Sequence, residues 1–282
     1  TAFVPAADAG AVRHACDDAD LVLVGDLRPG ADLPVASALA SSVVPVVLVE
    51  HGYPFCETGA CACERCPVRP VCRSSDRMAI YRQLAESAAL IAYLSPLHRQ
   101  VCEEHWGRHD GRTILAPPSL GDPIAFRPSA KAPIRAVAFP GSTDHAERAH
   151  LAEFAAGRPD LELDVFGRII AADPAIALPA NLHWRAPVAP EARLEQLRDC
   201  DLFVQLPGRP VPFGVEAATS ALAGREVVSN DRVGLLGWAR DLRDVAALRE
   251  SLDDGRRALV EAVASLLPGT RSRAQGDRKS VV

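Results

Sequence analysis

The stretch that decides the fold is DLFVQLPGRPVPFGVEAATSALAGREVVSNDRVGLLGW, residues 201–238. It predicts a buried strand, a loop rich in proline and glycine, a short helix that ends at Gly224, and a second buried strand. A helix that begins just after the Pro-Phe-Gly loop points free backbone N–H groups and its positive dipole end outward, which suits a phosphate or carboxylate. This order of elements is half of a mononucleotide-binding unit, although any α/β protein contains such turns.

Composition limits the classes of protein that the chain can belong to. With 282 residues, of which 48% are hydrophobic and 24% charged, it predicts a soluble globular protein with room for two domains. The net charge of −5 lacks the basic footprint of nucleic-acid binding. No apolar run reaches the length of about 18 residues that a membrane span needs. The start of the chain lacks the basic and apolar regions of a signal peptide. We expect a bacterial, cytoplasmic protein. Peripheral contact with the inner face of the membrane is compatible with this composition.

Strands alternate with helices on both sides of a proline-rich segment, TILAPPSLGDPIAFRPSAKAP at 113–133. Before it, strand patterns occur at LVLVG, SSVVPVVLVE, ALIAYLS and TIL, and the apolar run of LVLVG is typical of a parallel strand covered on both faces. A new series begins at PIRAVAFPG, and after Trp238 the pattern predicts one long or two abutting amphipathic helices. The alternation predicts an α/β fold with two facing Rossmann-like domains and parallel sheets.

The predicted N-terminal domain is incomplete, because only four strands precede the proline-rich segment. The tail is basic and polar, breaks the helical pattern before it, and is expected to be disordered or non-native. The predicted bounds are 1–121 for the N-terminal, acceptor-side domain with a Cys-rich insertion at 56–72, 122–132 for the linker, 133–270 for the C-terminal, donor-side domain, and 271–282 for the tail.

Histidines follow or lie near two of the predicted strands. The strand SSVVPVVLVE ends at Glu50 and is followed by His51, at the strand end beyond which open α/β sheets bind ligands. His51 is therefore a candidate functional residue, and a strand cap or a metal ligand is the alternative. His98 and His105 share a predicted helix but lie seven residues apart, which favours a solvated face over a ligand pair.

Five of the eight cysteines gather in HGYPFCETGACACERCPVRPVC, residues 51–72. Their spacing, C-x4-C-x-C-x2-C-x5-C, predicts a structural zinc with a closed thiolate shell, and an iron–sulfur cluster would need the same ligands. Disulfides or free thiols are the alternative, although no secretion signal supports disulfides. The other three cysteines, Cys16, Cys102 and Cys200, are predicted to be core residues. The candidate metal ligands are Cys56, Cys61, Cys63, Cys66 and Cys72.

The second half of the chain resembles the C-terminal domain of GT-B glycosyltransferases, in particular the family 4-like group that uses nucleotide-sugar donors. The resemblance rests on DLFVQLP at 201–207, PFG at 212–214, ALAG at 221–224 and EVVSNDRVG at 226–234. The first half is more loosely similar, at VVLVEHGYPFC, YLSPLHRQV and PPSLGDPIAFRP. The similarity covers about residues 20–267, and the chain resembles a divergent, N-terminally truncated member of the group.

The resemblance implies a reaction of hexosyltransferase type, in which a sugar is transferred from a nucleotide-diphosphate-sugar donor to a glycan or other small acceptor. It implies that the donor binds between the domains, mostly to the C-terminal one, that catalysis needs no cofactor, and that the pathway is polysaccharide or cell-surface glycan biosynthesis. His51 matches the family histidine near the transferred sugar and is the candidate catalytic residue. The candidate donor-binding residues are Gly141, Ser142, Arg148, Arg168, Pro212, Phe213, Gly214, Thr219 and Asn230.

The chain departs from the family at charged positions. The two family glutamates that grip the donor align with Val211 and Thr219, and Glu216 between them is out of register. Ser142 stands where the family has an arginine for the diphosphate, and no lysine follows it. A second hypothesis is therefore a catalytically inactive GT-B-like binding protein in which the metal-stapled cysteine loop is an interaction surface.

Overall fold

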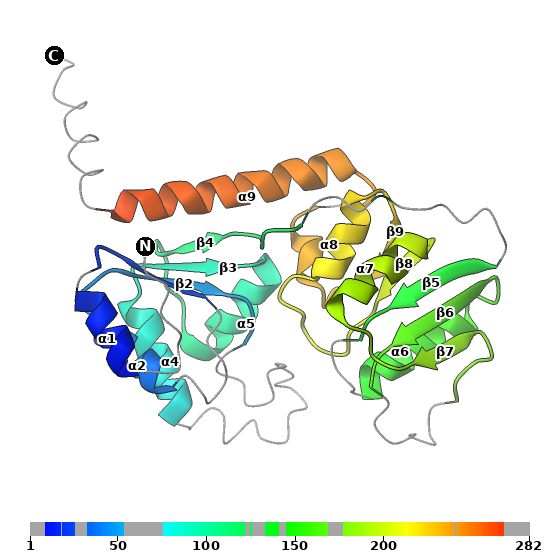
Figure 1. The fold of residues 1–282 in the computed structure, drawn as a ribbon, viewed down its shortest axis with the longest axis horizontal. Helices are drawn as coiled ribbons and strands as arrows, with labels where there is room; N and C mark the ends of the chain where they lie inside the picture. Colours follow the sequence, from blue (N-terminus) through cyan, green and yellow to red (C-terminus); the bar gives the residue numbers. More distant parts are fainter. Residues whose placement is uncertain are drawn as a thin grey trace, which may run out of the picture. The chain divides into compact units, whose positions relative to one another are not determined.

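Two parallel sheets organise the chain, one in each of two units (Figure 1). The computed structural model describes residues 9–17, 19–25, 33–53, 76–121, 125, 133–140, 145–168, 177–239 and 241–267. Unit 1 consists of Thr1–Pro117 with Asp253–Val282, and unit 2 consists of Pro118–Leu252. The predicted α/β fold with two parallel sheets is confirmed.

The sheet of unit 1 contains the four strands that the sequence predicts, in the order β1-β2-β3-β4. Each strand pairs in parallel with the next, so every crossover moves one place in the same direction. Right-handed crossovers of this kind put the connecting helices on one face of the sheet. The strands are β1 (Val22–Gly25), β2 (Val46–Glu50), β3 (Leu90–Tyr93) and β4 (Thr113–Leu115), and the helices are α1 (Ala9–Asp17), α2 (Leu33–Ala40), α4 (Asp76–Ser87) and α5 (Pro96–Trp106).

One core lies between this sheet and its helices. Neighbouring helices contact one another in the order α1, α2, α4 and α5, and α1, α2 and α4 lie on one side of the sheet in Figure 1. Cys16 and Cys102 are buried in this core, as predicted. The expectation that LVLVG is covered on both faces is wrong, because Leu23 is 61% exposed. In the described part of unit 1, β1 is an edge strand and only its other face, at Val24, packs into the core.

Helix α5 begins and ends where local sequence signals predict. The Ser95 hydroxyl accepts a hydrogen bond from the His98 amide at 3.0 Å, and Pro96 occupies the first turn, where its missing N–H costs nothing. Gly107 follows the last residue with a φ of 97°, which glycine adopts readily.

The sheet of unit 2 has the strand order β7-β6-β5-β8-β9, all parallel. The chain runs outward from β5 to β7, then crosses back to the other side of β5 for β8 and β9. This reversal between β5 and β8 is the topological switch point of a doubly wound sheet. The strands are β5 (Ile134–Ala138), β6 (Leu161–Phe166), β7 (Leu182–Arg185), β8 (Leu202–Gln205) and β9 (Glu226–Ser229), with α6 (His145–Ala156), α7 (Pro190–Asp199) and α8 (Val215–Leu222) between them.

After β9 the chain forms a 3-10 turn, η1 (Gly234–Gly237), and then α9 (Val245–Leu266). The segment predicted as one long or two abutting helices is a single helix of 22 residues. The division into units falls within it, since residues up to Leu252 belong to unit 2. None of the helices in the described ranges, α9 included, has the length and apolar character needed to cross a membrane.

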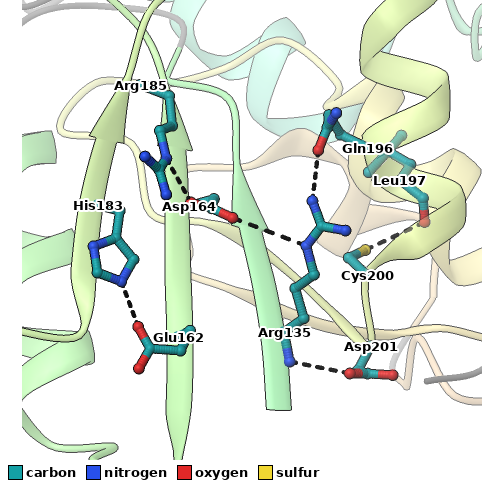
Figure 2. Close-up of polar contacts among 9 residues, drawn as sticks. All are labelled: Arg135, Glu162, Asp164, His183, Arg185, Gln196, Leu197, Cys200 and Asp201. Carbon is teal, nitrogen blue, oxygen red and sulfur yellow. Dashed lines mark hydrogen bonds and ion pairs between the residues drawn. The ribbon is translucent and has the colours of Figure 1, made fainter. Parts of the chain in front are cut away.

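Polar contacts fasten β5 at the amino-terminal edge of the unit 2 sheet (Figure 2). The backbone N–H of Arg135 donates to Asp201 Oδ2 at 3.0 Å, and the Asp201 N–H donates to the Arg135 carbonyl at 2.8 Å. The Arg135 guanidinium donates to Gln196 Oε1 of α7 at 2.7 Å and lies 3.9 Å from Asp164 of β6. One arginine thus connects β5 to its two neighbouring strands and to α7, and Cys200, predicted as a core residue, is buried beside it.

We predict that Asp201→Ala destabilises unit 2 by about 1–3 kcal/mol, because the half-buried Arg135 N–H loses its charged acceptor. Urea unfolding followed by circular dichroism measures the loss. Asp160→Ala is the matched control, since the Asp160 carboxylate pairs with Arg158 on the exposed surface. Equal losses in the two variants would contradict a special role for the Arg135–Asp201 contact.

Candidate functional site

The switch point of unit 2 is the place where an open α/β sheet binds ligands. The ladder between β5 and β8 has two residue pairs, the second of them Val137 with Phe203, whereas β8 runs alongside β9 to Gln205. Strands β5 and β8 are therefore no longer paired at their carboxyl ends. The segments that leave this point are the loops that carry most of the candidate donor-binding residues.

The turn from β8 into α8 is shaped by Gly214, which has a φ of +99° and precedes the helix. A Cβ atom at this position would lie 2.6 Å from Val233 Cγ1 and 2.8 Å from Gln205 Oε1, so only glycine fits. Phe213 is 2% exposed. The close approach predicted at Gly214 is therefore present, and Phe213 is buried beside it, while its predicted place under α8 stays a prediction; Pro212, next to them, is half-buried.

Two loops at the carboxyl ends of β8 and β9 are joined by hydrogen bonds. Asn230 Nδ2 donates to the Pro207 carbonyl at 3.0 Å, and Arg232 Nη1 donates to the Gly208 carbonyl at 3.1 Å. Val211 forms a parallel bridge with Val233. Asn230, a candidate donor-binding residue, thus uses its amide to hold the β8–α8 loop in place.

The first turn of α8 carries an ion pair that the sequence did not predict. Glu216 accepts a hydrogen bond from Arg193 of α7 at 3.0 Å, and the Arg193 guanidinium lies 5.6 Å from the ring centre of Phe139. Phe139 follows β5, so this pair lies beside the switch point and joins α7 to α8. Thr219, one helical turn beyond Glu216, is half-buried and offers a hydroxyl in place of a carboxylate.

The two candidate arginines lie at the carboxyl ends of neighbouring strands. The guanidinium of Arg148, in the first turn of α6, lies 6.0 Å from the ring centre of Trp184 on β7, and its buried Nε forms no hydrogen bond with the described residues. Arg168 is exposed two residues after β6 ends. Between them Gly167 approaches Pro140 closely, since a Cβ at Gly167 would lie 2.5 Å from Pro140 Cγ. This part of the sheet edge therefore carries two positive charges.

Several predicted site residues lie outside the described residues. They are Gly141, Ser142, Cys56, Cys61, Cys63, Cys66 and Cys72. The zinc or iron–sulfur site therefore stays a prediction. Within the ranges that the structure does describe, no group of three or more His, Cys, Asp or Glu side chains is arranged to hold a metal ion.

His51 follows the carboxyl end of β2 in unit 1, where the sequence places it. Glu50, the last residue of β2, is 1% exposed and pairs in register with Tyr93, the last residue of β3. His51 itself is exposed on a bend. Its imidazole is therefore accessible at a sheet edge where a ligand can approach.

His98 was expected on a solvated helix face, and that expectation is wrong: the residue is fully buried. Its Nδ1 accepts the Leu94 N–H at 3.2 Å, so Nε2 carries the proton and donates to the Gly52 carbonyl at 2.8 Å. Burial lowers the pKa of His98 to about 4; the hydrogen bond to Gly52 raises this pKa and the charge on His51 lowers it. The ring is thus a neutral link between the start of α5 and the residue after His51.

His105 is also buried, with an exposed fraction of 6%, so the expectation of a solvated face is wrong for this residue as well. Its Nδ1 donates to the Val101 carbonyl at 2.7 Å, one turn back in the same helix. The helical spacing of seven residues put both histidines on one face, but that face packs against the sheet.

Sequence reasoning also missed Gln205 and Arg193. Gln205 is the last residue of β8, and its buried Oε1 accepts no hydrogen bond within the described ranges. Its position at a strand's carboxyl end is the signal that would have identified it. Arg193 gave no such signal, because its partners Glu216 and Phe139 are distant in the sequence.

No protein-family model matches the sequence, and no curated protein does either. Solved structures match in fold. Anabaena HepE in complex with UDP and glucose is 13% identical over 91% of this chain and 81% of that chain, with a TM-score of 0.62. The GtfA/B complex is 14% identical over 92% and 57%, with a TM-score of 0.52. WaaG, a glycosyltransferase involved in lipopolysaccharide biosynthesis, is 14% identical over 90% and 79%, with a TM-score of 0.50.

These likenesses show the fold of the chain, which is that of GT-B glycosyltransferases, with two Rossmann-like domains. The fold that the resemblance implied is therefore confirmed. The low identities fit the expectation of a divergent chain.

We predict that Gly214→Ala destabilises unit 2 by about 2–4 kcal/mol, because a positive φ and an overlap with Val233 act together. Gly224→Ala is the matched control: Gly224 also has a positive φ, of 78°, but a Cβ there meets nothing within 4 Å. Its expected cost is about 1 kcal/mol. Urea unfolding of the two variants measures the difference, and equal costs would show that the close approach to Val233 is unimportant.

We predict that His98 makes unit 1 sensitive to acid. Its pKa in the folded state, about 4, lies below the value of 6.5 expected when unfolded, so the unfolded state binds the proton first as pH falls. The stabilisation is complete above about pH 6.5 and is lost toward pH 4, by about 3 kcal/mol.

The measurement is the free energy of unfolding between pH 7 and pH 4 for the wild type and His98→Gln. The carboxyl groups titrate in both proteins, and the rings beside His98, Tyr53 and Tyr93, stay neutral in this range. The variant should be less stable at pH 7 and should lose less stability than the wild type on acidification. Parallel curves would contradict the prediction.

Proposed function

We propose that this protein is a glycosyltransferase that transfers a sugar from a nucleoside-diphosphate-sugar to the hydroxyl of a glycan or other small acceptor. The observation that carries the proposal is the β8–loop–α8 segment at the switch point of a GT-B-type unit. Its tight turn at Gly214 brings backbone N–H groups to the carboxyl edge of the sheet. A structure with the same fold, Anabaena HepE, is complexed with UDP and glucose.

In the proposed reaction, the bond between the sugar C1 and the diphosphate oxygen breaks and a bond from C1 to the acceptor oxygen forms. The nucleoside diphosphate leaves with the bonding electron pair, and the acceptor hydroxyl gives up its proton. Catalysis then rests on positioning the two reactants and stabilising the charge that develops on the leaving diphosphate. No metal or other cofactor is part of this proposal.

The proposed donor site lies in unit 2. The first turns of α6 and α8 offer backbone N–H groups and positive dipole ends to the diphosphate. Arg148 and Arg168 supply positive charge at the same edge of the sheet, in place of the family's arginine and lysine. The Thr219 hydroxyl would contact the donor in place of a family glutamate.

The proposed acceptor side lies in unit 1, where His51 is exposed directly after β2. A histidine is the commonest general base in enzymes, and we assign His51 the role of accepting the proton of the attacking hydroxyl. Polysaccharide or cell-surface glycan synthesis is the pathway we propose, and the role of WaaG in lipopolysaccharide biosynthesis is in keeping with it.

One observation favours a second candidate, a GT-B-like binding protein without transferase activity. The positions of the two gripping glutamates hold Val211, whose backbone serves the bridge to Val233, and the neutral Thr219. Glu216 does not replace them, because it is paired with Arg193. Such a protein would bind a nucleotide-sugar and leave it intact.

We predict that a uridine, guanosine or adenosine diphosphate sugar raises the melting temperature of the wild-type protein and is converted to the free nucleoside diphosphate. Arg148→Ala should weaken donor binding by about 10-fold or more, because a charge-assisted contact with the diphosphate is lost. Titration by thermal shift measures the binding, and a coupled assay of nucleoside diphosphate release measures the turnover.

The matched control is Arg158→Ala, since Arg158 precedes β6 at the opposite edge of the sheet and pairs with Asp160. This variant should bind the donor as the wild type does. Binding without turnover would favour the binding-protein hypothesis. No thermal shift with any of the three donor classes would overturn both candidates.

A further inference from the structure

One buried ring joins three parts of unit 1 that are separate in the sequence. His98 lies in the first turn of α5, and its Nδ1 accepts the N–H of Leu94, at the end of β3. Its Nε2 donates to the carbonyl of Gly52, the residue after His51. The imidazole therefore spans from the β3–α5 junction to the loop that carries the candidate catalytic residue.

The orientation of this ring is strongly determined. The Tyr53 ring meets it edge-on, with 5.3 Å between the ring centroids. The Tyr93 ring, at the end of β3, also meets it edge-on, with 5.7 Å between the centroids. Trp106 Nε1 donates to the Tyr93 hydroxyl at 3.1 Å and thereby fixes Tyr93. Ser95 caps the same turn of α5 by accepting the His98 N–H. These contacts leave the imidazole one rotamer and one tautomer.

We infer that His98 is a positioning residue for His51: its Nε2–H···O=C bond to Gly52 holds the bend after β2 in the place where His51 can act. The catalytic part of this inference, namely that His51 acts in sugar transfer, rests on the proposed function. His98 is fully buried, so in this role it acts through the backbone and not by contact with a substrate.

The chemistry of the position explains why it needs an imidazole. The side chain must accept from one backbone N–H and donate to a backbone carbonyl across the ring, and a neutral histidine does both. His51 is exposed, so its own side chain has little packing to hold it. Because a misplacement of about 1 Å can lower a catalytic rate by about 100-fold, the anchor on the next residue matters for rate.

A structural role alone is the alternative, and the two roles predict different results. If His98 only stabilises the fold, its loss lowers the melting temperature and affects kinetics no more than other destabilising changes in α5. If His98 positions His51, its loss lowers kcat while the KM for the donor, bound by unit 2, stays the same. The effect on kcat then also disappears when His51 is absent.

The test uses the full chain with His98→Phe, which keeps a ring but loses both hydrogen bonds, and His98→Gln, whose amide can still donate to Gly52. His105→Gln is the matched control, because His105 is a buried histidine of the same helix whose Nδ1 bonds within the helix. The donor is UDP-glucose, or the donor class that the wild type turns over. Nucleoside diphosphate release is measured with water or a glycan as acceptor, and the imidazole C–H signal of His51 is followed by NMR.

We expect His98→Phe to lower kcat by about 10- to 100-fold with the KM for the donor within about 2-fold. His98→Gln should recover most of kcat, and His105→Gln should lose melting temperature without losing kcat. The His51 NMR signal should shift or broaden in His98→Phe alone. In a His51→Ala background, His98→Phe should cause no further loss of kcat.

Two results would overturn the inference. One is an unchanged His51 signal in folded His98→Phe, which can be observed whether or not the protein transfers sugar. The other is an equal loss of kcat from His98→Phe with and without His51. Absence of turnover in the wild type would instead defeat the proposed function, and the NMR comparison would then decide the positioning of His51 by itself. If His98→Phe does not fold, His98→Leu, which also loses both hydrogen bonds, takes its place, and the same two results overturn the inference.

Discussion

The reversal of strand order between β5 and β8 is the constraint on which the rest of unit 2 depends. The two strands share a ladder of only two residue pairs, and Arg135 and Asp201 fasten it at the amino-terminal edge. The last pair of this ladder is Val137 with Phe203, so the carboxyl ends of β5 and β8 are not paired with each other and continue directly into their loops. A parallel sheet cannot reverse without creating such a point, so this binding position follows from topology before any side chain is chosen.

The loops at that point are held by a glycine turn and by side chains that donate to backbone carbonyls. Gly214 permits the turn, and the carbonyls of Pro207 and Gly208 accept from Asn230 and Arg232. None of these contacts uses the side chain of Val211 or Thr219, so the scaffold can persist while the residues at those two positions change. The family that the sequence resembles has glutamates at the positions of Val211 and Thr219. A chain without these carboxylates can therefore keep the fold. The fold therefore does not establish which reaction the chain catalyses, and turnover has to be measured directly.

Unit 1 uses the same parallel arrangement with a different outcome. Its strands follow one another in order, so its helices pack in one layer and the buried side of that layer includes polar residues. His98 is tolerated there because both ring nitrogens are hydrogen-bonded and the ring stays neutral. A buried histidine with two backbone partners is costly to replace, because its loss leaves a buried N–H and a carbonyl without their hydrogen bonds.

The sequence by itself determined the α/β class, the strands, the caps of α5 at Ser95 and Gly107, and the glycine turn that precedes α8. These features depend on residues close in the chain, whose periodicity and backbone preferences act locally. Tertiary structure alone decided the burial of His98, the pairing of Glu216 with Arg193, and the exposed face of β1 at Leu23. His98 and Gly52 are 46 residues apart, and nothing in either segment encodes the other. Helical spacing shows which residues share a face, but only packing decides whether that face meets water or the core.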